Sequence, residues 1–163
     1  LYSDIITSYE IMKGVFEESL SNFSELFNVI EYVDPSVDYD KFCKINKDNE
    51  KRKALGVFFI NLSMNGIIPN TTIISITRNL LAQIYTFISQ ENKKNEVDEL
   101  TENIALLFKK DLYGDDDDDD AEYELIEGFT ITEIIEKIAH SKVKDYKSLT
   151  NKTVFKFMDM IEM

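Results

Sequence analysis

The sequence predicts an all-α protein built as a stack of helical hairpins. Its 163 residues include only five glycines and two prolines, too few for an all-β protein with many tight turns. Apolar residues recur at intervals of three and four along most of the chain, the spacing that places them on one face of a helix. Segment 50–66 has apolar residues on two opposite faces, so it needs neighbours on both sides. Such an inner helix is typical of a layered helical array.

The first part of the chain is expected to form one helical pair. Residues 3–30 carry regularly spaced apolar side chains, and Gly14 is predicted to separate two helices there. Pro35 ends this pair, because its ring disfavours the helical conformation in the preceding residue. A new segment then starts over residues 38–45, with Asp38 as its N-cap, and leads into the helix of residues 50–66.

The helix of residues 50–66 is predicted to be covered on two sides and to end at Gly66 and Pro69. One apolar stripe consists of Leu55, Phe58, Phe59 and Leu62. The opposite face carries Val57, Ile60 and Met64. The next helix, capped by Asn70 or Thr71, completes a second antiparallel pair. Its expected core positions are Ile73, Ile76, Leu80, Leu81, Ile84, Phe87 and Ile88.

The C-terminal half shows the same periodicity. A helix capped by Asn95 is expected to bury Val97, Leu100, Ile104, Leu107 and Phe108. Another is marked by Phe129, Ile131, Ile134, Ile135 and Ile138. A last helix covers residues 149–163. The first helices of successive pairs then start near residues 3, 50, 95 and 149, roughly 45 residues apart, which predicts an α-solenoid of HEAT-repeat type. The units share no motif, so an irregular helical bundle is the alternative.

Composition and charge narrow the classes of function. The length fits one domain, residues 1–163. A lone Cys43 and the lack of a membrane-length apolar run favour a reducing, cytoplasmic location. The net charge of −13 argues against broad attraction to nucleic acid or anionic lipid and favours partners with a basic surface. The chain begins at Leu1 without a secretory signal pattern, and we expect a further N-terminal part to precede it.

Residues for catalysis or metal binding are scarce in the sequence. His140 is the only histidine, and nothing in the spacing brings it near Cys43. The scattered glycines predict no phosphate-binding loop. The run Asp115–Asp120 has carboxylates for a hard cation, but it lacks the spaced ligands and the glycine turn of a calcium loop. We therefore expect no enzyme, cofactor or metal, and a disordered acidic loop near residues 113–122.

Four cations lie close together in the sequence near the start of the inner helix: Lys47, Lys51, Arg52 and Lys53. One interpretation is that they bind RNA phosphate or an acidic patch on a protein partner. The other is a solvated face balanced by Asp48 and Glu50, with Arg52 or Lys53 paired to an adjacent repeat. The second is favoured, because four cations in an acidic chain give only a small, salt-sensitive attraction.

The last helix carries a candidate protein-binding surface. The residues expected to face the core are Val154, Phe157, Met158 and Ile161. Phe155 lies roughly 110° away from their mean direction, so it is predicted to be exposed. Lys152, Lys156 and Asp159 fall beside it, and an apolar anchor with a charged rim is how compact interface hot spots are often built. The alternative is that Phe155 packs against the preceding helix.

Two parts of the chain resemble a known family. The first is Asp38-Tyr-Asp-Lys-Phe-Cys followed by residues 49–62, in which a basic pair precedes Leu-Gly and an aromatic-rich helix, and then by Gly66-Ile-Ile. The second is residues 150–162, where small polar residues and a lysine precede Phe, Asp and an apolar pair. Both are similar to the middle domain of translation initiation factor 4G, most closely to the homologues encoded by large DNA viruses. The resemblance covers essentially the whole chain but starts at the second helical repeat of that domain.

The resemblance implies a non-catalytic HEAT scaffold for translation initiation. Such a scaffold binds and activates a DEAD-box RNA helicase of the initiation factor 4A type, with its last repeats on the N-terminal lobe of the helicase. It implies that Phe155 is the helicase-contacting aromatic of the closing helix. It also implies a cytoplasmic protein, in the host cytoplasm if viral, with weak RNA affinity and with other initiation factors bound through segments outside this chain.

Two alternatives to the helicase-binding scaffold stay open at this point. One is an RNA-binding HEAT module of an RNA-processing or decay factor. The other is an all-α viral interaction protein with an unrelated target.

Overall fold

The computed structural model describes residues 2–112 and 126–162, with the side chains from Ser3 onward, and the run Asp115–Asp120 lies outside these ranges. Within them the all-α prediction is confirmed. Among the described residues, β-type pairing is limited to an isolated antiparallel bridge between Ile126 and Phe129. Short 3-10 turns cover Lys110–Leu112 and Val143–Asp145. The helices are α1 (Tyr2–Glu25), α2 (Tyr39–Met64), α3 (Asn70–Ile88), α4 (Lys94–Leu107), α5 (Ile131–Ala139) and α6 (Asn151–Glu162).

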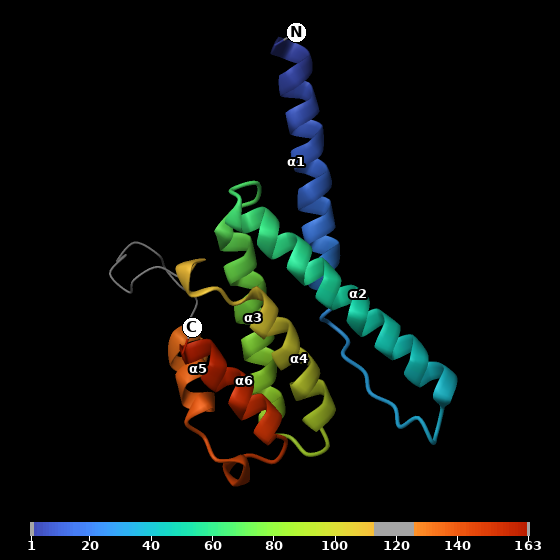
Figure 1. Cartoon of the computed structure of the whole chain (residues 1–163), viewed down its shortest axis with the longest axis vertical. Coiled ribbons are helices and arrows are strands. Elements are labelled where there is room, and N and C mark those ends of the chain that lie inside the picture. Colours follow the sequence, from blue (N-terminus) through green and yellow to red (C-terminus); the bar gives the residue numbers. More distant parts are fainter. Residues whose placement is uncertain (1, 113–125, 163) are drawn as a thin grey trace.

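The helices pack as a series in which α3, α4, α6 and α5 also contact one another in a closed circuit. Figure 1 shows α4 between α2 and α6, and α4 contacts both of them. Helix α3 packs on α4 and also reaches α5, and α5 packs on α6. Helix α1 meets the rest of the molecule only near its C-terminal end, and its first half extends away from the other helices (Figure 1). The series therefore has α1 at one end and the packed pair α5 and α6 at the other.

The expected break at Gly14 is wrong, because α1 runs without interruption from Tyr2 to Glu25. A single glycine inside a helix costs only about 1 kcal/mol relative to alanine, which two flanking stretches of good helix-forming residues offset. Nothing lies within 4 Å of the position that a Cβ of Gly14 would occupy, so no close packing requires a glycine there. One helix thus replaces the predicted first pair.

Helix α2 begins and ends as the sequence indicates but is longer than expected. The Asp38 carboxylate accepts a hydrogen bond from the Lys41 backbone N–H at 2.9 Å, so the predicted N-cap is confirmed. The helix then runs without a break from Tyr39 to Met64, so the two segments predicted over residues 38–45 and 50–66 form one element. After Met64, Gly66 takes a positive φ of 71°, a conformation that glycine adopts without steric cost, and the helix stops.

The prediction that α2 is covered on two sides is wrong. Phe59 and Ile60 are buried, and the Phe59 ring lies 5.1 Å from the ring of Phe23 on α1. Val57, Phe58 and Met64 are exposed. The reason is that α4, α3 and the end of α1 approach α2 from one side only, so the outer face of α2 lacks a neighbour among the described residues. One face of α2 is therefore exposed along much of the helix.

The apolar positions expected for α3 and α4 are buried, except that Phe87 is only partly buried, and the expected caps are wrong. Pro69 occupies the N-cap position of α3, and the Asn70 side chain instead accepts a hydrogen bond from the Ser63 hydroxyl at 2.7 Å. Asn95 lies inside the first turn of α4, whose N-cap is Lys93. A polar residue near a helix start indicates the boundary to within one or two positions, and tertiary contacts decide which residue occupies the cap.

Replacing Gly56 with alanine is expected to stabilise the protein by about 0.5–1 kcal/mol, because glycine lowers helix stability by that amount. Gly56 lies inside α2, and an added Cβ would meet Leu107 at 3.7 Å and Phe23 at 3.8 Å, which are ordinary van der Waals separations. Urea denaturation followed by circular dichroism measures the change. A loss of stability would show that α2 and α4 are packed too tightly for a methyl group.

Candidate protein-binding surface on the last helix

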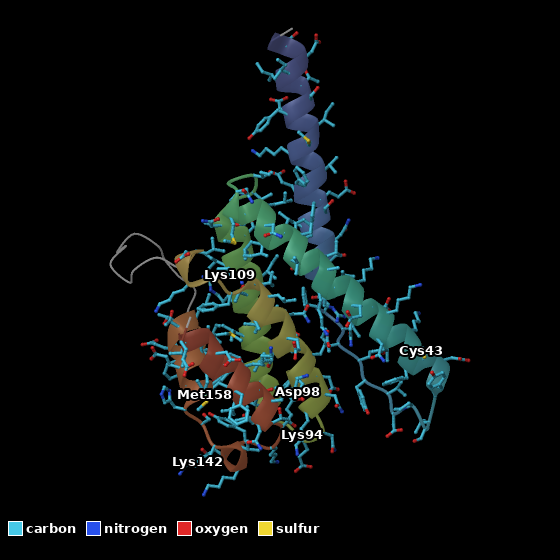
Figure 2. All side chains as sticks on the ribbon, in the orientation of Figure 1. Cys43, Lys94, Asp98, Lys109, Lys142 and Met158 are labelled. Carbon is cyan, nitrogen blue, oxygen red and sulfur yellow. The ribbon has the colours of Figure 1, made fainter. Side chains whose placement is uncertain are left out.

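Hydrogen bonds from α4 determine the rotation of α6 about its axis. The Asp98 carboxylate accepts from the hydroxyls of Thr150 at 2.5 Å and Thr153 at 2.7 Å. The Thr150 hydroxyl oxygen in turn accepts from the Thr153 backbone N–H at 3.1 Å, which caps the start of the helix. Figure 2 shows Asp98 on α4 beside the lower end of α6, with Met158 further along α6. The direction of every later side chain on α6 follows from this anchor.

The segment before α6 is tied to the turn between α3 and α4. Ser148 is fully buried, and its backbone N–H donates to the Ile88 carbonyl at 2.9 Å. Its hydroxyl donates to the Gln90 carbonyl at 2.5 Å and accepts from the Lys93 N–H at 2.9 Å. A buried serine with both donor and acceptor satisfied holds two loops in one relative position. The segment that leads into α6 and the first turn of α6 are therefore both held in place by hydrogen bonds.

The predicted exposure of Phe155 is confirmed. Its side chain is 61% exposed, whereas Phe157, two residues later, is completely buried. The alternative, that Phe155 packs against the preceding helix, is wrong in this structure. An exposed aromatic side chain is a candidate interaction residue where other exposed apolar side chains lie beside it.

The predicted core position of Met158 is wrong, because Met158 is 40% exposed and Met160 is buried instead. The cause is Thr153, which is fully buried by its hydrogen bond to Asp98. That polar residue rotates the buried face of α6 toward Met160, which an apolar pattern alone does not show. Val154 and Phe157 are buried as expected, and Ile161 is partly buried against the core. Met158 thereby joins Phe155 on the outer face.

We name the outer face of α6 the Phe155 surface; it comprises Lys152, Phe155, Lys156, Met158 and Asp159. Phe155 and Met158 are its apolar centre, and Lys152, Asp159 and the partly buried Lys156 form the rim. The rim is linked to α4, because the Lys152 ammonium lies 3.0 Å from a carboxylate oxygen of Glu102. All the α6 residues predicted to form the site thus lie on one face, and Met158, which the apolar pattern places in the core, lies there too.

The Lys152–Glu102 pair shifts both groups in the direction expected of an ion pair. The hydrogen bond that Lys152 donates to Glu102 raises the pKa of Lys152, against a smaller opposing effect of burial. Burial raises the pKa of Glu102, but the hydrogen bond from Lys152 and the charges of Lys152, Lys156 and Lys53 together outweigh it and lower that pKa. Both side chains are therefore charged near neutral pH. Because Lys152 is more than half exposed, water screens the pair and its contribution to stability is small.

The four cations near residue 50 do not form one surface. Arg52 is buried; its Nε donates to the Leu26 carbonyl at 3.2 Å, and its guanidinium lies 3.5 Å from Glu99 on α4. Burial lowers the pKa of Arg52, opposed by the charge of Glu99, and a guanidinium stays protonated at neutral pH. Lys53 also turns toward Glu99, at 3.8 Å. Lys47 and Lys51 are exposed and are the members that remain accessible to a partner.

The few residues suited to catalysis lie apart. Cys43 is exposed near the N-terminal end of α2 (Figure 2). His140 is the C-cap of α5, and its Nδ1 lies 2.8 Å from the Glu136 carbonyl oxygen. Residues 2–112 and 126–162 contain no group of three or more histidine, cysteine, aspartate or glutamate side chains arranged to hold a metal ion. Over the same ranges, no helix combines the length and apolar character that crossing a membrane requires.

The chain was compared with protein-family models, with curated proteins and with solved structures, and none of these comparisons found a match.

Proposed function

We propose that this chain is a translation initiation scaffold of the initiation factor 4G middle-domain type, which binds and activates a DEAD-box RNA helicase through the Phe155 surface. The observation that carries the proposal is the contrast between the exposed Phe155 and the buried Phe157 on a helix whose rotation Asp98 fixes. The family-like residues of segments 38–68 and 150–162 supply the identity of the partner. In this proposal the chain has no catalytic activity of its own and works in the cytoplasm, the host cytoplasm if the protein is viral.

The arrangement of the helices supports a HEAT-type solenoid as the finer description of the fold. In such a solenoid, each helical hairpin packs on the next, so equivalent helices of successive hairpins lie side by side. Helix α4 lies between α2 and α6 and contacts both, and α3 contacts α5. Hairpins α2–α3 and α4–α5 would then be two units, with α1 and α6 belonging to incomplete units at the ends.

The composition of the Phe155 surface suits a protein partner. Aromatic residues are enriched among interface hot spots, and truncating a central one typically costs 2 kcal/mol or more in binding. Met158 beside Phe155 widens the apolar centre with an adaptable side chain. Lys152, Lys156 and Asp159 present both signs of charge on the rim, which favours specific orientation of a partner rather than general attraction to polyanions.

Phe155→Ala is expected to weaken binding to an initiation factor 4A-type helicase at least tenfold and to abolish stimulation of its ATPase, because the central anchor is removed. The melting temperature should stay within about 2 °C of the unaltered chain, since exposed residues contribute little to stability. Binding is measured by calorimetry and activation by steady-state ATPase assays. Phe58→Ala is the matched control, because Phe58 is a comparably exposed phenylalanine on α2.

Three outcomes would contradict the proposal. They are a lack of helicase binding by the unaltered chain, equal binding by the Phe155→Ala variant, and an equal loss in the Phe58→Ala control. RNA binding without any effect on the helicase would instead favour an RNA-processing or decay factor. In that case a Lys47→Ala/Lys51→Ala variant should lose affinity for RNA, because these are the accessible lysines of the cluster.

A further inference from the structure

Helix α1 carries one continuous apolar stripe of which only the second half is covered. Positions spaced by three and four residues from Ile5 to Phe23 fall on a single face of the helix. Leu20 and Phe23, near the C-terminal end, are buried against the rest of the molecule. Ile5, Tyr9 and Met12, on the same face, are between 54% and 65% exposed. The stripe therefore passes from the core into an open groove.

The groove lies between α1 and the start of α3 and has a volume of about 850 Å³. Tyr9, Met12, Phe16 and Leu20 form one wall, and Ile67, Ile68 and Ile76 lie on the other side. Gly66, with its positive φ, turns the chain so that Ile68 is buried while Ile67 stays exposed at the edge. The border of the groove consists mainly of serine, threonine and asparagine side chains. An apolar floor with a polar border is the usual composition of a binding groove.

The groove fits a helix better than an extended segment. An extended peptide needs backbone partners, and the groove is walled mainly by α1 and α3, whose backbone groups are already paired within each helix. In the loop between α2 and α3, the Ile67 N–H is also already bonded, to the Leu62 carbonyl. A helix satisfies its own backbone and needs only apolar contacts. The stretch from Tyr9 to Leu20 is about 17 Å long at 1.5 Å per residue, which matches three turns of a docked helix.

The negative charge of this protein favours some partner helices over others. Helix α1 contains five acidic residues, Asp4, Glu10, Glu17, Glu18 and Glu25, against the single base Lys13, which pairs with Glu17 at 3.9 Å. The whole chain has a net charge of −13. A second copy would bring the same negative charge to the groove and be repelled, whereas a basic helix would be attracted.

We propose that the groove between α1 and α3 binds an amphipathic helix with basic flanks, supplied by a partner protein. The apolar residues of that helix, spaced by three and four, contact Tyr9, Met12 and Phe16. One of its basic flanks lies toward Glu17, the acidic side chain of α1 that lines the groove, and the net negative charge of α1 and of the whole chain favours its approach. This site is separate from the Phe155 surface, because α1 and α6 lie at opposite ends of the helix series. The proposal therefore does not depend on helicase binding.

The test uses an 18-residue designed helix with leucines on one face and lysines elsewhere, labelled for fluorescence anisotropy. Two further peptides serve as probes: one with glutamate in place of lysine, and one with the leucines and lysines scrambled. We expect the leucine–lysine helix to bind the whole chain and the other two to bind at least tenfold more weakly. Tyr9→Ser/Met12→Ser should weaken binding at least tenfold.

The matched control is Ile11→Ser/Val15→Ser, which removes two comparably exposed apolar residues of α1 that do not line the groove. It should bind the leucine–lysine helix as the unaltered chain does. Equal losses in both double variants, equal binding of the scrambled peptide, or no binding at all would overturn the proposal. So would a dimer, detected by sedimentation equilibrium, that the Tyr9→Ser/Met12→Ser variant dissociates, because a second copy would then occupy the groove.

Discussion

Phe157→Ala is expected to lower the free energy of unfolding by about 3–5 kcal/mol, the range found when a buried phenylalanine is truncated. Phe157 is completely buried on α6, where α4 and α5 both pack. Removing the ring takes away its burial and leaves a cavity that α6 cannot close by moving, because Asp98 and Ser148 hold its start. Urea denaturation at neutral pH, followed by circular dichroism, measures the loss.

Phe155→Ala provides the internal control for this measurement. The same side chain is removed from the same helix, but Phe155 is 61% exposed, so the change in stability should stay within about 0.5 kcal/mol. Comparable losses in the two variants would mean that α6 is rotated from the orientation described. The candidate binding surface would then be misplaced as well.

Arg52→Ala is expected to destabilise the protein by about 3 kcal/mol, because it removes the most buried cation facing Glu99 and leaves the more exposed Lys53, at 3.8 Å, to compensate that carboxylate. Arg52 joins three parts of the molecule. It contacts the Leu26 carbonyl after α1, Asn49 within α2 at 2.8 Å and Glu99 on α4 at 3.5 Å. Its guanidinium also lies 5.5 Å from the centre of the Phe27 ring. Truncation removes all four contacts together.

The neighbouring Lys51→Ala is the control, since Lys51 is exposed and its replacement should change stability by no more than about 0.5 kcal/mol. A double-mutant cycle with Glu99→Gln isolates the Arg52–Glu99 interaction. Equal effects of Arg52→Ala and Lys51→Ala on stability would indicate that the Arg52 side chain is exposed rather than buried. The interpretation of the four cations as a binding patch would then regain support.

The helical pattern predicted burial well wherever a helix has neighbours along its whole length. Ile73, Ile84 and Leu100 are fully buried as their spacing indicates. The pattern failed on α1 and α2 for a physical reason. Apolar periodicity shows which face needs cover, but it contains no information on whether the chain itself supplies that cover. Tyr9 and Val57 are therefore exposed although their positions suit a core.

The candidate site was predictable to the extent that it depends on helix geometry. Phe155 lies outside the apolar stripe at any rotation of α6 that buries Phe157. Met158 was assigned to the core because the buried hydroxyl of Thr153 gives no signal in an apolar pattern. The inward turn of Arg52 depends on Glu99, which is 47 residues away and comes close only through packing. The local spacing of residues in the sequence cannot predict long-range polar contacts of this kind.

The way α1 is attached has a consequence for where the protein first opens. Side chains of residues 3–15 are exposed, and α1 contacts the other helices mainly through Leu20 and Phe23, with Phe27 buried in the turn that follows α1. Local opening has a low free energy where few apolar contacts are lost. Fraying of the first turns of α1 leaves Asp98, Thr153 and the whole of α6 in place. We therefore expect the two ends of the molecule to differ: the first turns of α1 open at low free energy, while α6 keeps its orientation.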